Sequence, residues 1–352
     1  MAYPATEQIG EVIEGVAARD LAAAIPDPIL LIDANAATRH ANPAAIGAFG
    51  HLPEGTLVLH RFRTPEMQKL VSTLVHDRRE GSAEYVERVP LERAFRVSAR
   101  PLGGKTGLFL LHFKDQSEAR RIDRMRADFI ANASHELRTP LASISGFIET
   151  LRGPARDDAK AREIFLEIMQ QQTSRMARLI DDLLSLSRIE MKPYMRASEK
   201  IDLVATVASA VETLGHLTTE YNVQVTLAAP QHPVLVPGSR DELMQVFLNL
   251  LENACKYGQD GGRVEITFGH GEGNGAEATV TFRDYGPGIA DEHIPRITER
   301  FYRVDAESSR VKNGTGLGLA IVKHILTRHD GRLTVKSTLG EGSAFSVHLP
   351  VD

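Results

Sequence analysis

Residues 130–151, IANASHELRTPLASISGFIETL, carry a helical repeat that decides the fold of the middle of the chain. Their apolar side chains recur at alternating steps of three and four, a spacing that predicts a helix packed against other helices. The residues of this stripe are Ile130, Ala133, Leu137, Leu141, Ile144, Ile148 and Leu151. Gly153-Pro154 then predicts the end of the helix.

A second amphipathic helix is expected from about residue 158 to the residues before Pro193. Its apolar stripe consists of Phe165, Ile168, Met176, Leu179, Leu183 and Leu186. Two helices joined by a short turn cannot cover both stripes by themselves, whereas two copies of the hairpin form a four-helix bundle that buries them. We therefore expect a helical dimerisation domain over residues 117–193 and a homodimer.

His135 lies two positions from both Ala133 and Leu137, so its side chain is predicted to point away from the apolar stripe and toward solvent. Thr139, one turn later, shares this exposed face. The neighbouring Glu136 can accept a hydrogen bond or a proton from the imidazole. A neutral imidazole is a competent nucleophile near pH 7.

An exposed histidine beside a carboxylate is usually an ordinary surface feature. Pro140, however, lies inside the helical pattern and is predicted to kink the helix just after the histidine. A proline inside a helix costs about 3 kcal/mol of helix stability, so its presence favours a functional role for this segment.

The composition is that of an ordinary globular protein. The 352 residues predict two or three domains, and 42% of them are hydrophobic and 25% charged. The formal net charge of -5 provides no broad basic field, so nucleic acid is not an expected partner. The single cysteine, Cys255, excludes an internal disulfide framework, a cysteine-based zinc site and an iron–sulfur cluster, and it favours a reducing compartment.

A membrane span needs about 18 consecutive apolar residues, and the best runs, such as residues 203–211, reach about half that length. The first residues do not follow the pattern of a secretion signal. The sequence therefore predicts a cytoplasmic chain without a membrane span.

Residues 20–116 are predicted to form a small α/β domain that follows an N-terminal segment, residues 1–19. Asn42-Pro43 predicts the start of a short helix, and Gly103-Gly104 is a hairpin signal. Strands are expected at residues 28–33, 95–99 and 108–113. This pattern resembles a PAS sensory domain.

Residues 197–352 are predicted to form an α/β sandwich on a largely antiparallel sheet. Helices are expected at residues 241–257 and 320–328. Strands are expected at residues 263–268, 278–282, 333–337 and 343–349.

One face of the predicted helix 241–257 carries Asn249, Asn253 and Lys256, which follow one another at steps of four and three. Amide oxygens and a lysine on one face suit a magnesium ion with phosphates, because magnesium prefers oxygen ligands. The alternative is that the asparagines only cap the helix or face solvent.

Two glycine-rich segments follow. Asp284 begins the sequence Asp-Tyr-Gly-Pro-Gly directly after a predicted strand, which is either a simple turn or a carboxylate placed to accept from the exocyclic amine of a purine. Asn313-Gly314-Thr315-Gly316-Leu317-Gly318 leads into a helix, and exposed amides at a helix start favour a phosphate. Residues 297–312 between them are charged and are expected to form a mobile lid.

These blocks, in this order and at these spacings, resemble the transmitter core of the sensor histidine kinases over residues 120–350, about two thirds of the chain. The resemblance implies a multidomain α/β protein with a PAS-like domain, a dimerisation hairpin and a C-terminal Bergerat-type α/β sandwich. It also implies ATP and Mg²⁺ as cofactors. The phosphoryl group would pass to an aspartate on the receiver domain of a separate response regulator.

By the same resemblance, His135 is the phosphoacceptor and Glu136 assists its attack on the γ-phosphate of ATP. Thr139 would position the water that removes phosphate from the partner, and Arg303 would meet the transferring phosphoryl group. Asn253, with Asn249 in support, is implied to hold the magnesium ion. Further implied nucleotide contacts are Lys256 on the phosphates, Tyr257 and Asp284 at the adenine, and the loop residues Gly286, Gly288, Gly314, Thr315, Gly316, Leu317 and Gly318.

Residues 294–305, IPRITERFYRVD, resemble the phosphate-regulon sensor kinases, although Thr298 replaces an aromatic residue that many histidine kinases carry. Members of that subfamily usually have membrane helices before the PAS unit. Anchoring of the full-length protein to the inner membrane by an upstream segment is therefore an open alternative.

The sequence has two rival interpretations. A hydrolytic ATPase of the gyrase and chaperone type would carry a glutamate four residues before Asn253, where this chain has Asn249, which cannot accept a proton. A scaffold without kinase activity would not need the intact histidine and nucleotide blocks.

Overall fold

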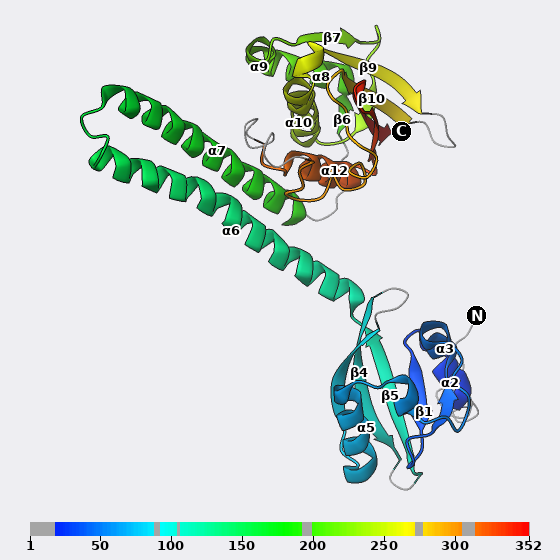
Figure 1. Cartoon of the computed structure of the whole chain (residues 1–352). Coiled ribbons are helices and arrows are strands. Elements are labelled where there is room, and N and C mark those ends of the chain that lie inside the picture. Colours follow the sequence, from blue (N-terminus) through cyan, green and yellow to red (C-terminus); the bar gives the residue numbers. More distant parts are fainter. Residues whose placement is uncertain are drawn as a thin grey trace. The chain divides into compact units, whose positions relative to one another are not determined.

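The computed structural model describes residues 18–87, 92–103, 106–191, 199–271, 277–304 and 314–351. It divides between Asp128 and Phe129 into two compact units, which are considered separately. Most of the predicted N-terminal segment and the second half of the predicted lid, together with Gly104 and Asn313, lie outside the described residues. Figure 1 shows the elements of both units.

The first unit contains a five-stranded antiparallel sheet with the strand order β2-β1-β5-β4-β3. Its strands are β1 (Ile29–Ile32), β2 (Thr38–Ala41), β3 (Gly81–Glu87), β4 (Arg93–Leu102) and β5 (Leu108–Asp115). Its helices are α2 (Ala18–Ala24), α3 (Pro43–Phe49), α4 (Val58–Arg61) and α5 (Pro65–Asp77). The predicted strands and the β4–β5 pairing around Gly103 are confirmed.

Aromatic rings fill the core of this unit. Phe49 lies 5.0 Å from Phe62 and 4.9 Å from Phe113 between ring centroids, and Phe95 and Tyr85 complete the cluster.

Buried Asn42 fixes the start of α3, as the sequence predicts. Its side-chain oxygen accepts from the amides of Ala45 at 2.9 Å and Ile29 at 3.0 Å, while its amide donates to the Asp27 carbonyl at 2.9 Å. This residue therefore joins α3, β1 and the segment that precedes β1.

Two long helices form the predicted hairpin: α6 (Ser117–Arg152) and α7 (Ala159–Met191). Helix α6 continues through Pro140. Phe147 of α6 stacks on Phe165 of α7 with centroids 5.0 Å apart, and Figure 1 shows the two helices side by side. None of the described helices has a stretch that is both long and apolar enough to cross a membrane.

The rest of the second unit is a five-stranded sheet with helices packed against it. The strand order is β11-β12-β10-β9-β7; β7 and β9 are parallel and the other neighbours antiparallel, so the predicted largely antiparallel sheet is confirmed. Its strands are β7 (Gln224–Ala228), β9 (Arg263–Gly271), β10 (Glu277–Asp284), β11 (Arg332–Thr338) and β12 (Gly342–Pro350). Short strands β6 (Lys200–Asp202) and β8 (Leu235–Pro237) pair separately.

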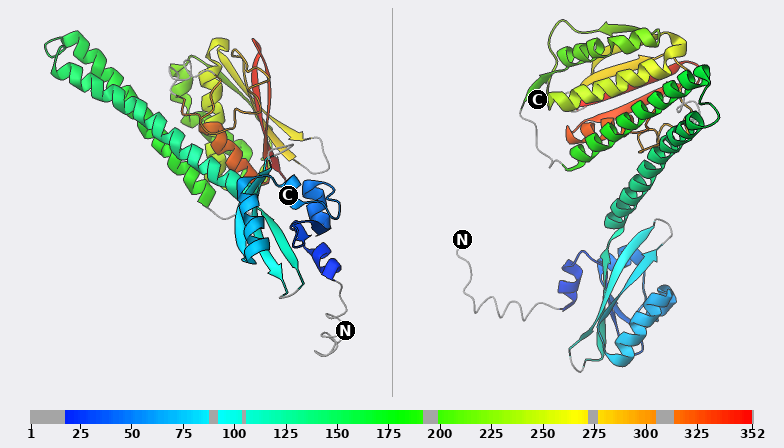
Figure 2. Two further views of the ribbon diagram at one scale, coloured as in Figure 1. Left: turned by 60° about the horizontal axis from the view of Figure 1, so that its bottom comes forward. Right: turned by 90° about the vertical axis from the view of Figure 1, so that its left-hand side faces the viewer.

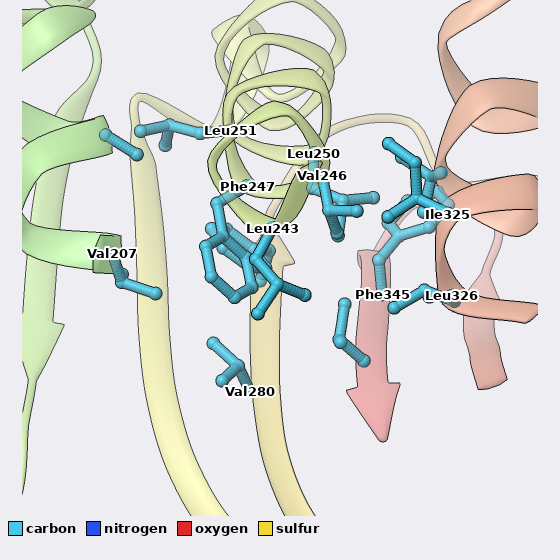
Figure 3. Packing of buried hydrophobic residues seen from close by; sticks show 14 of the residues in the cluster. Val207, Leu243, Val246, Phe247, Leu250, Leu251, Val280, Ile325, Leu326 and Phe345 are labelled. Atoms are coloured by element: carbon cyan, nitrogen blue, oxygen red, sulfur yellow. The ribbon is translucent and has the colours of Figure 1, made fainter. Parts of the chain in front are cut away.

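Helices α8 (Leu203–Thr213), α9 (Gly215–Glu220), α10 (Arg240–Tyr257) and α12 (Gly318–Arg328) belong to this unit, with a short turn of helix at η1 (Gln259–Gly261). Figure 3 shows the core between them: Phe247 and Leu243 of α10 point toward Val280 of the sheet, with Val207 of α8 on one side and Ile325 of α12 on the other.

Helix α7 packs alongside α12, as Figures 1 and 2 show. Leu179 and Leu186 of the predicted α7 stripe are buried in the same core as α10 and α12. The expectation that a second copy must cover the whole α7 stripe is therefore wrong for these two residues, because the chain's own C-terminal part covers them.

Candidate active site

A cavity of about 550 Å³ opens between α7, α10, the segment after β10 and the segment before α12. Its walls combine polar side chains from α7 and α10 with apolar groups such as Ile289, Ile297 and Phe345. A cavity of this size with a mixed polar and apolar lining is typical of small-molecule sites.

Helix α10 supplies the polar floor. Asn249, Asn253 and Lys256 line the cavity, as their spacing predicts, and Tyr257, which the resemblance implied, lines it too. The helix is oriented by its opposite face, where Leu243, Val246, Phe247, Leu250, Leu251 and Ala254 are buried. The nitrogen of buried Lys256 lies 5.8 Å from the centre of the Tyr257 ring.

Asp284 lies at the end of β10 and lines the apolar end of the cavity, with only 3% of its surface exposed. One carboxylate oxygen accepts from the amides of Gly286 at 3.0 Å and Ser343 at 3.3 Å. Burial raises the pKa of Asp284, and these backbone hydrogen bonds oppose that rise. The second oxygen is the group through which Asp284 can accept from a ligand.

The turn after Asp284 needs glycine. Gly288 has φ +74°, and a Cβ there would lie 2.1 Å from the carbonyl oxygen of Thr338. Gly286 does not line the cavity, but a Cβ on it would lie 2.2 Å from the carbonyl oxygen of Tyr257. The two glycines therefore let the turn approach α10 and the end of β11.

The segment before α12 closes another side of the cavity. Gly314, Thr315, Gly316 and Gly318 line it, whereas the side chain of Leu317 is fully buried in the core. Gly316, at φ +74°, packs against the backbone of Phe301.

Helix α7 contributes residues that the sequence analysis did not single out: Arg178, Asp181 and Asp182. The Thr315 hydroxyl donates to Asp182 at 2.7 Å, which ties the glycine-rich segment to the hairpin. Burial and the nearby Glu252 carboxylate raise the pKa of Asp182, although the Thr315 hydrogen bond lowers it. In sequence these residues are ordinary surface charges of an amphipathic helix, and only the packing of α7 brings them to the cavity.

His135 is exposed on α6, as predicted, and lines a second hollow of about 320 Å³ together with Glu136, Glu299 and Arg300. Thr139 is also exposed and its hydroxyl donates to the His135 carbonyl at 3.3 Å, but it lines neither hollow.

Arg303 connects the two hollows. It lines the large cavity, and its guanidinium donates to the Glu136 carboxylate at 2.9 Å. Glu136 also accepts from Arg175 of α7 at 3.0 Å. The residue next to His135 in sequence is thus joined directly to the wall of the large cavity.

The residues present fit a nucleotide with a magnesium ion. Among the described residues, Nδ2 of Asn249 and Nε of Arg303 are buried without a hydrogen-bond partner, and both residues line the cavity. A buried polar group left unpaired costs about 1–3 kcal/mol, which a polar ligand would recover. Because the amide can turn by 180°, Asn249 and Asn253 can also present oxygen atoms to a hard cation.

Two family models match the chain. Residues 125–192 match the His Kinase A (phospho-acceptor) domain, and residues 238–352 match the histidine kinase-, DNA gyrase B-, and HSP90-like ATPases. The second match implies ATP binding.

Curated relatives agree with these matches. The phosphate regulon sensor protein PhoR of Pseudomonas aeruginosa is 42% identical over 241 residues, which is 68% of this chain and 53% of PhoR. The sensor protein kinase WalK of Staphylococcus epidermidis is 31% identical over 93% of this chain and 53% of its own length. The chain thus spans about half the length of these relatives.

A crystal structure of the histidine kinase ThkA in complex with the response regulator protein TrrA is also similar, with a TM-score of 0.53. The alignment covers 96% of this chain and 99% of that one at 17% identity, a level that supports the fold alone.

Proposed function

We propose that this chain, which belongs to the histidine kinases of two-component systems, transfers the γ-phosphoryl group of ATP to His135. One observation carries the proposal. Arg303 lines the nucleotide-sized cavity and also binds Glu136, the neighbour of His135, so Glu136 links the donor site to the hollow that His135 lines.

ATP would bind with its adenine at the apolar end of the cavity. The free oxygen of Asp284 would accept from the exocyclic amine, between the side chains of Ile289 and Phe345. Lys256 and the amides of the Gly314–Gly318 segment would meet the phosphates.

Asn253 and Asn249 would hold the magnesium ion, which supplies positive charge to the phosphates when bound. The residues themselves position the substrate and exclude water, and this positioning accounts for most of the catalysis in phosphoryl transfer.

In the transfer step, a ring nitrogen of neutral His135 forms the new bond to the γ-phosphorus while the bond from that phosphorus to the β–γ bridging oxygen breaks, releasing ADP. Glu136 would orient the imidazole and accept its proton, and Arg303 would turn from Glu136 to the transferring group.

Phosphohistidine would then give its phosphoryl group to an aspartate of a response regulator. The match of residues 125–192 to the phospho-acceptor domain supports a partner of this class. Exposed Thr139, one turn from His135, would position a water that dephosphorylates the regulator.

Thr139→Ala should keep self-phosphorylation and lose this phosphatase activity. An unchanged rate of regulator dephosphorylation would refute the role of Thr139.

We further propose a homodimer with a PAS-like sensory unit. The strand order β2-β1-β5-β4-β3 with helices on the sheet supports the sensory unit. Large apolar side chains along the hairpin stay exposed in the single chain and support the dimer: Ile130, Leu141, Ile148, Ile164, Leu166, Ile180 and Leu184.

The name of the Pseudomonas relative supports signalling that responds to phosphate. Phosphorylation of the cognate regulator in cells should then change between low and high phosphate, and identical levels in both media would reject this assignment.

The kinase reaction is tested by incubating the chain with γ-labelled ATP and magnesium. We expect a phosphoprotein stable in base and labile in acid that is absent in His135→Gln and in Asn253→Ala, because one variant lacks the acceptor and the other a magnesium ligand. His293→Gln, at another histidine, should keep the label. Undiminished labelling of His135→Gln would refute the assignment.

A further inference from the structure

We propose that Arg175 of α7 is a positioning residue that keeps the Glu136 carboxylate paired and oriented beside His135 while Arg303 engages the phosphoryl group. This inference rests on the proposed kinase function and assigns a residue of the second hairpin helix to it.

The geometry is a single carboxylate oxygen shared by two arginines. The Arg175 guanidinium lies 3.0 Å and the Arg303 guanidinium 2.9 Å from the same oxygen of Glu136. The side chains of Arg175 and Arg303 are only 11% and 9% exposed, and that of Glu136 is 26% exposed. Ion pairs this far from solvent are screened less than surface pairs.

The two arginines are held differently. Arg175 lies within the 33-residue helix α7, one turn before Leu179, which is buried in the core. Arg303 follows the turns at Glu299–Phe301, outside any helix or strand, and lines the nucleotide cavity. Of the two, only Arg303 can reach the nucleotide, because Arg175 is not among the described residues that line that cavity.

The charges explain why a second arginine is needed. When Arg303 turns to the γ-phosphate, Glu136 would be left as a lone negative charge facing an incoming anion, which is unfavourable in a partly buried site. With Arg175 in place, the pair remains neutral and the planar guanidinium fixes the direction of the carboxylate. Arg175 thus acts on His135 through Glu136.

The experiment compares the initial rate of His135 phosphorylation against ATP concentration for the full chain and its Arg175 variants. Arg175→Met should lower kcat by about tenfold or more, a loss expected for a misplaced catalytic group, and leave the KM for ATP within about twofold. Arg175→Lys should recover part of kcat because it keeps the charge. Arg188→Met, an exposed arginine on the same helix, should behave like the parent chain.

A double-mutant cycle separates positioning from a structural role. In a Glu136→Gln background, Arg175→Met should cause little further loss, since the charge it compensates is gone. An equal loss in both backgrounds, an unchanged kcat, or a change confined to KM would overturn the inference. If the parent chain itself carries no phosphate on His135, the proposed function fails instead, so the two failures are distinguishable.

Discussion

Asp182 is a half-buried acid in the wall of the proposed site for an anionic ligand. Its carboxylate accepts from Thr315 at 2.7 Å, and burial raises its pKa above the ordinary value of 3.8. An ionised Asp182 opposes the binding of a triphosphate. Because its pKa is raised, it takes up a proton at a higher pH than an exposed aspartate does.

The change Asp182→Asn should therefore tighten ATP binding at neutral pH by roughly three- to tenfold, the effect expected for removing one like charge from a partly buried site. As pH falls toward the raised pKa, the parent chain loses the same charge, so the affinity ratio of variant to parent should approach one. Titration of both proteins with a fluorescent ATP analogue, from pH 8 down to the lowest pH at which both stay folded, measures this ratio. Asp157→Asn, at the exposed hairpin turn, is the control.

A ratio that stays constant or grows on acidification would contradict this electrostatic role for Asp182.

For single residues, the sequence predicts a place in the site where the spacing puts several side chains on one face of a helix. Asn249, Asn253 and Lys256 reach the cavity because steps of four and three return to one side of α10. The roles of Arg175 and Asp182 could not be predicted from the sequence. They depend on the packing of α7 against α12 and on the position of the Arg303 guanidinium.

Among the elements, the turn after β10 is tightly constrained. Gly288 combines φ +74° with a backbone oxygen 2.1 Å from where a Cβ would stand. An alanine there would have to displace Thr338 at the end of β11 and would be strained even after this movement.

Gly288→Ala is expected to destabilise the second unit by more than about 1 kcal/mol and to weaken ATP binding, because the turn that carries it lines the cavity. Thermal unfolding with and without ATP measures both effects. Gly269→Ala in β9, where a Cβ would meet open space and φ is ordinary, should leave both unchanged. Equal behaviour of the two variants would contradict the argument from strain.

Secondary structure follows closely from local sequence. The Asn42 cap, the strands beside the Gly103 hairpin and the helix over residues 241–257 agree with their predicted places. Leu317 differs: it lies between two cavity glycines, yet its side chain is fully buried in the core. Sequence periodicity does not predict which way a side chain faces in a short irregular segment. For Leu317 the contacts with α10 and the sheet determine it.

For the whole molecule, the hairpin has a packed side and an exposed apolar side. The α7 residues Leu179 and Leu186 pack into the core of the second unit, while Leu141, Ile148 and Leu184 stay exposed. Helical periodicity identifies an apolar stripe but not the partner that covers it, so it could not be predicted which α7 residues the C-terminal part covers.

The exposed residues lead to a prediction of oligomeric state. The full chain should sediment as a dimer at micromolar concentration, and Leu141→Glu with Ile148→Glu should shift it to a monomer, because charges would enter an apolar bundle. Glu149→Gln, next to Ile148, serves as the control. A parent chain that sediments as a monomer would contradict the proposed bundle.

The central claim is that the phosphoryl group of ATP is accepted by the imidazole of His135. It is tested most directly by phosphorylating the chain, digesting it at mildly alkaline pH and locating the phosphoryl group by mass spectrometry with a fragmentation that preserves phosphohistidine. The account predicts modification of the His135 ring, with Ser134 unmodified. Phosphate on Ser134 or on another histidine, or none at all in a chain that binds ATP, would contradict it.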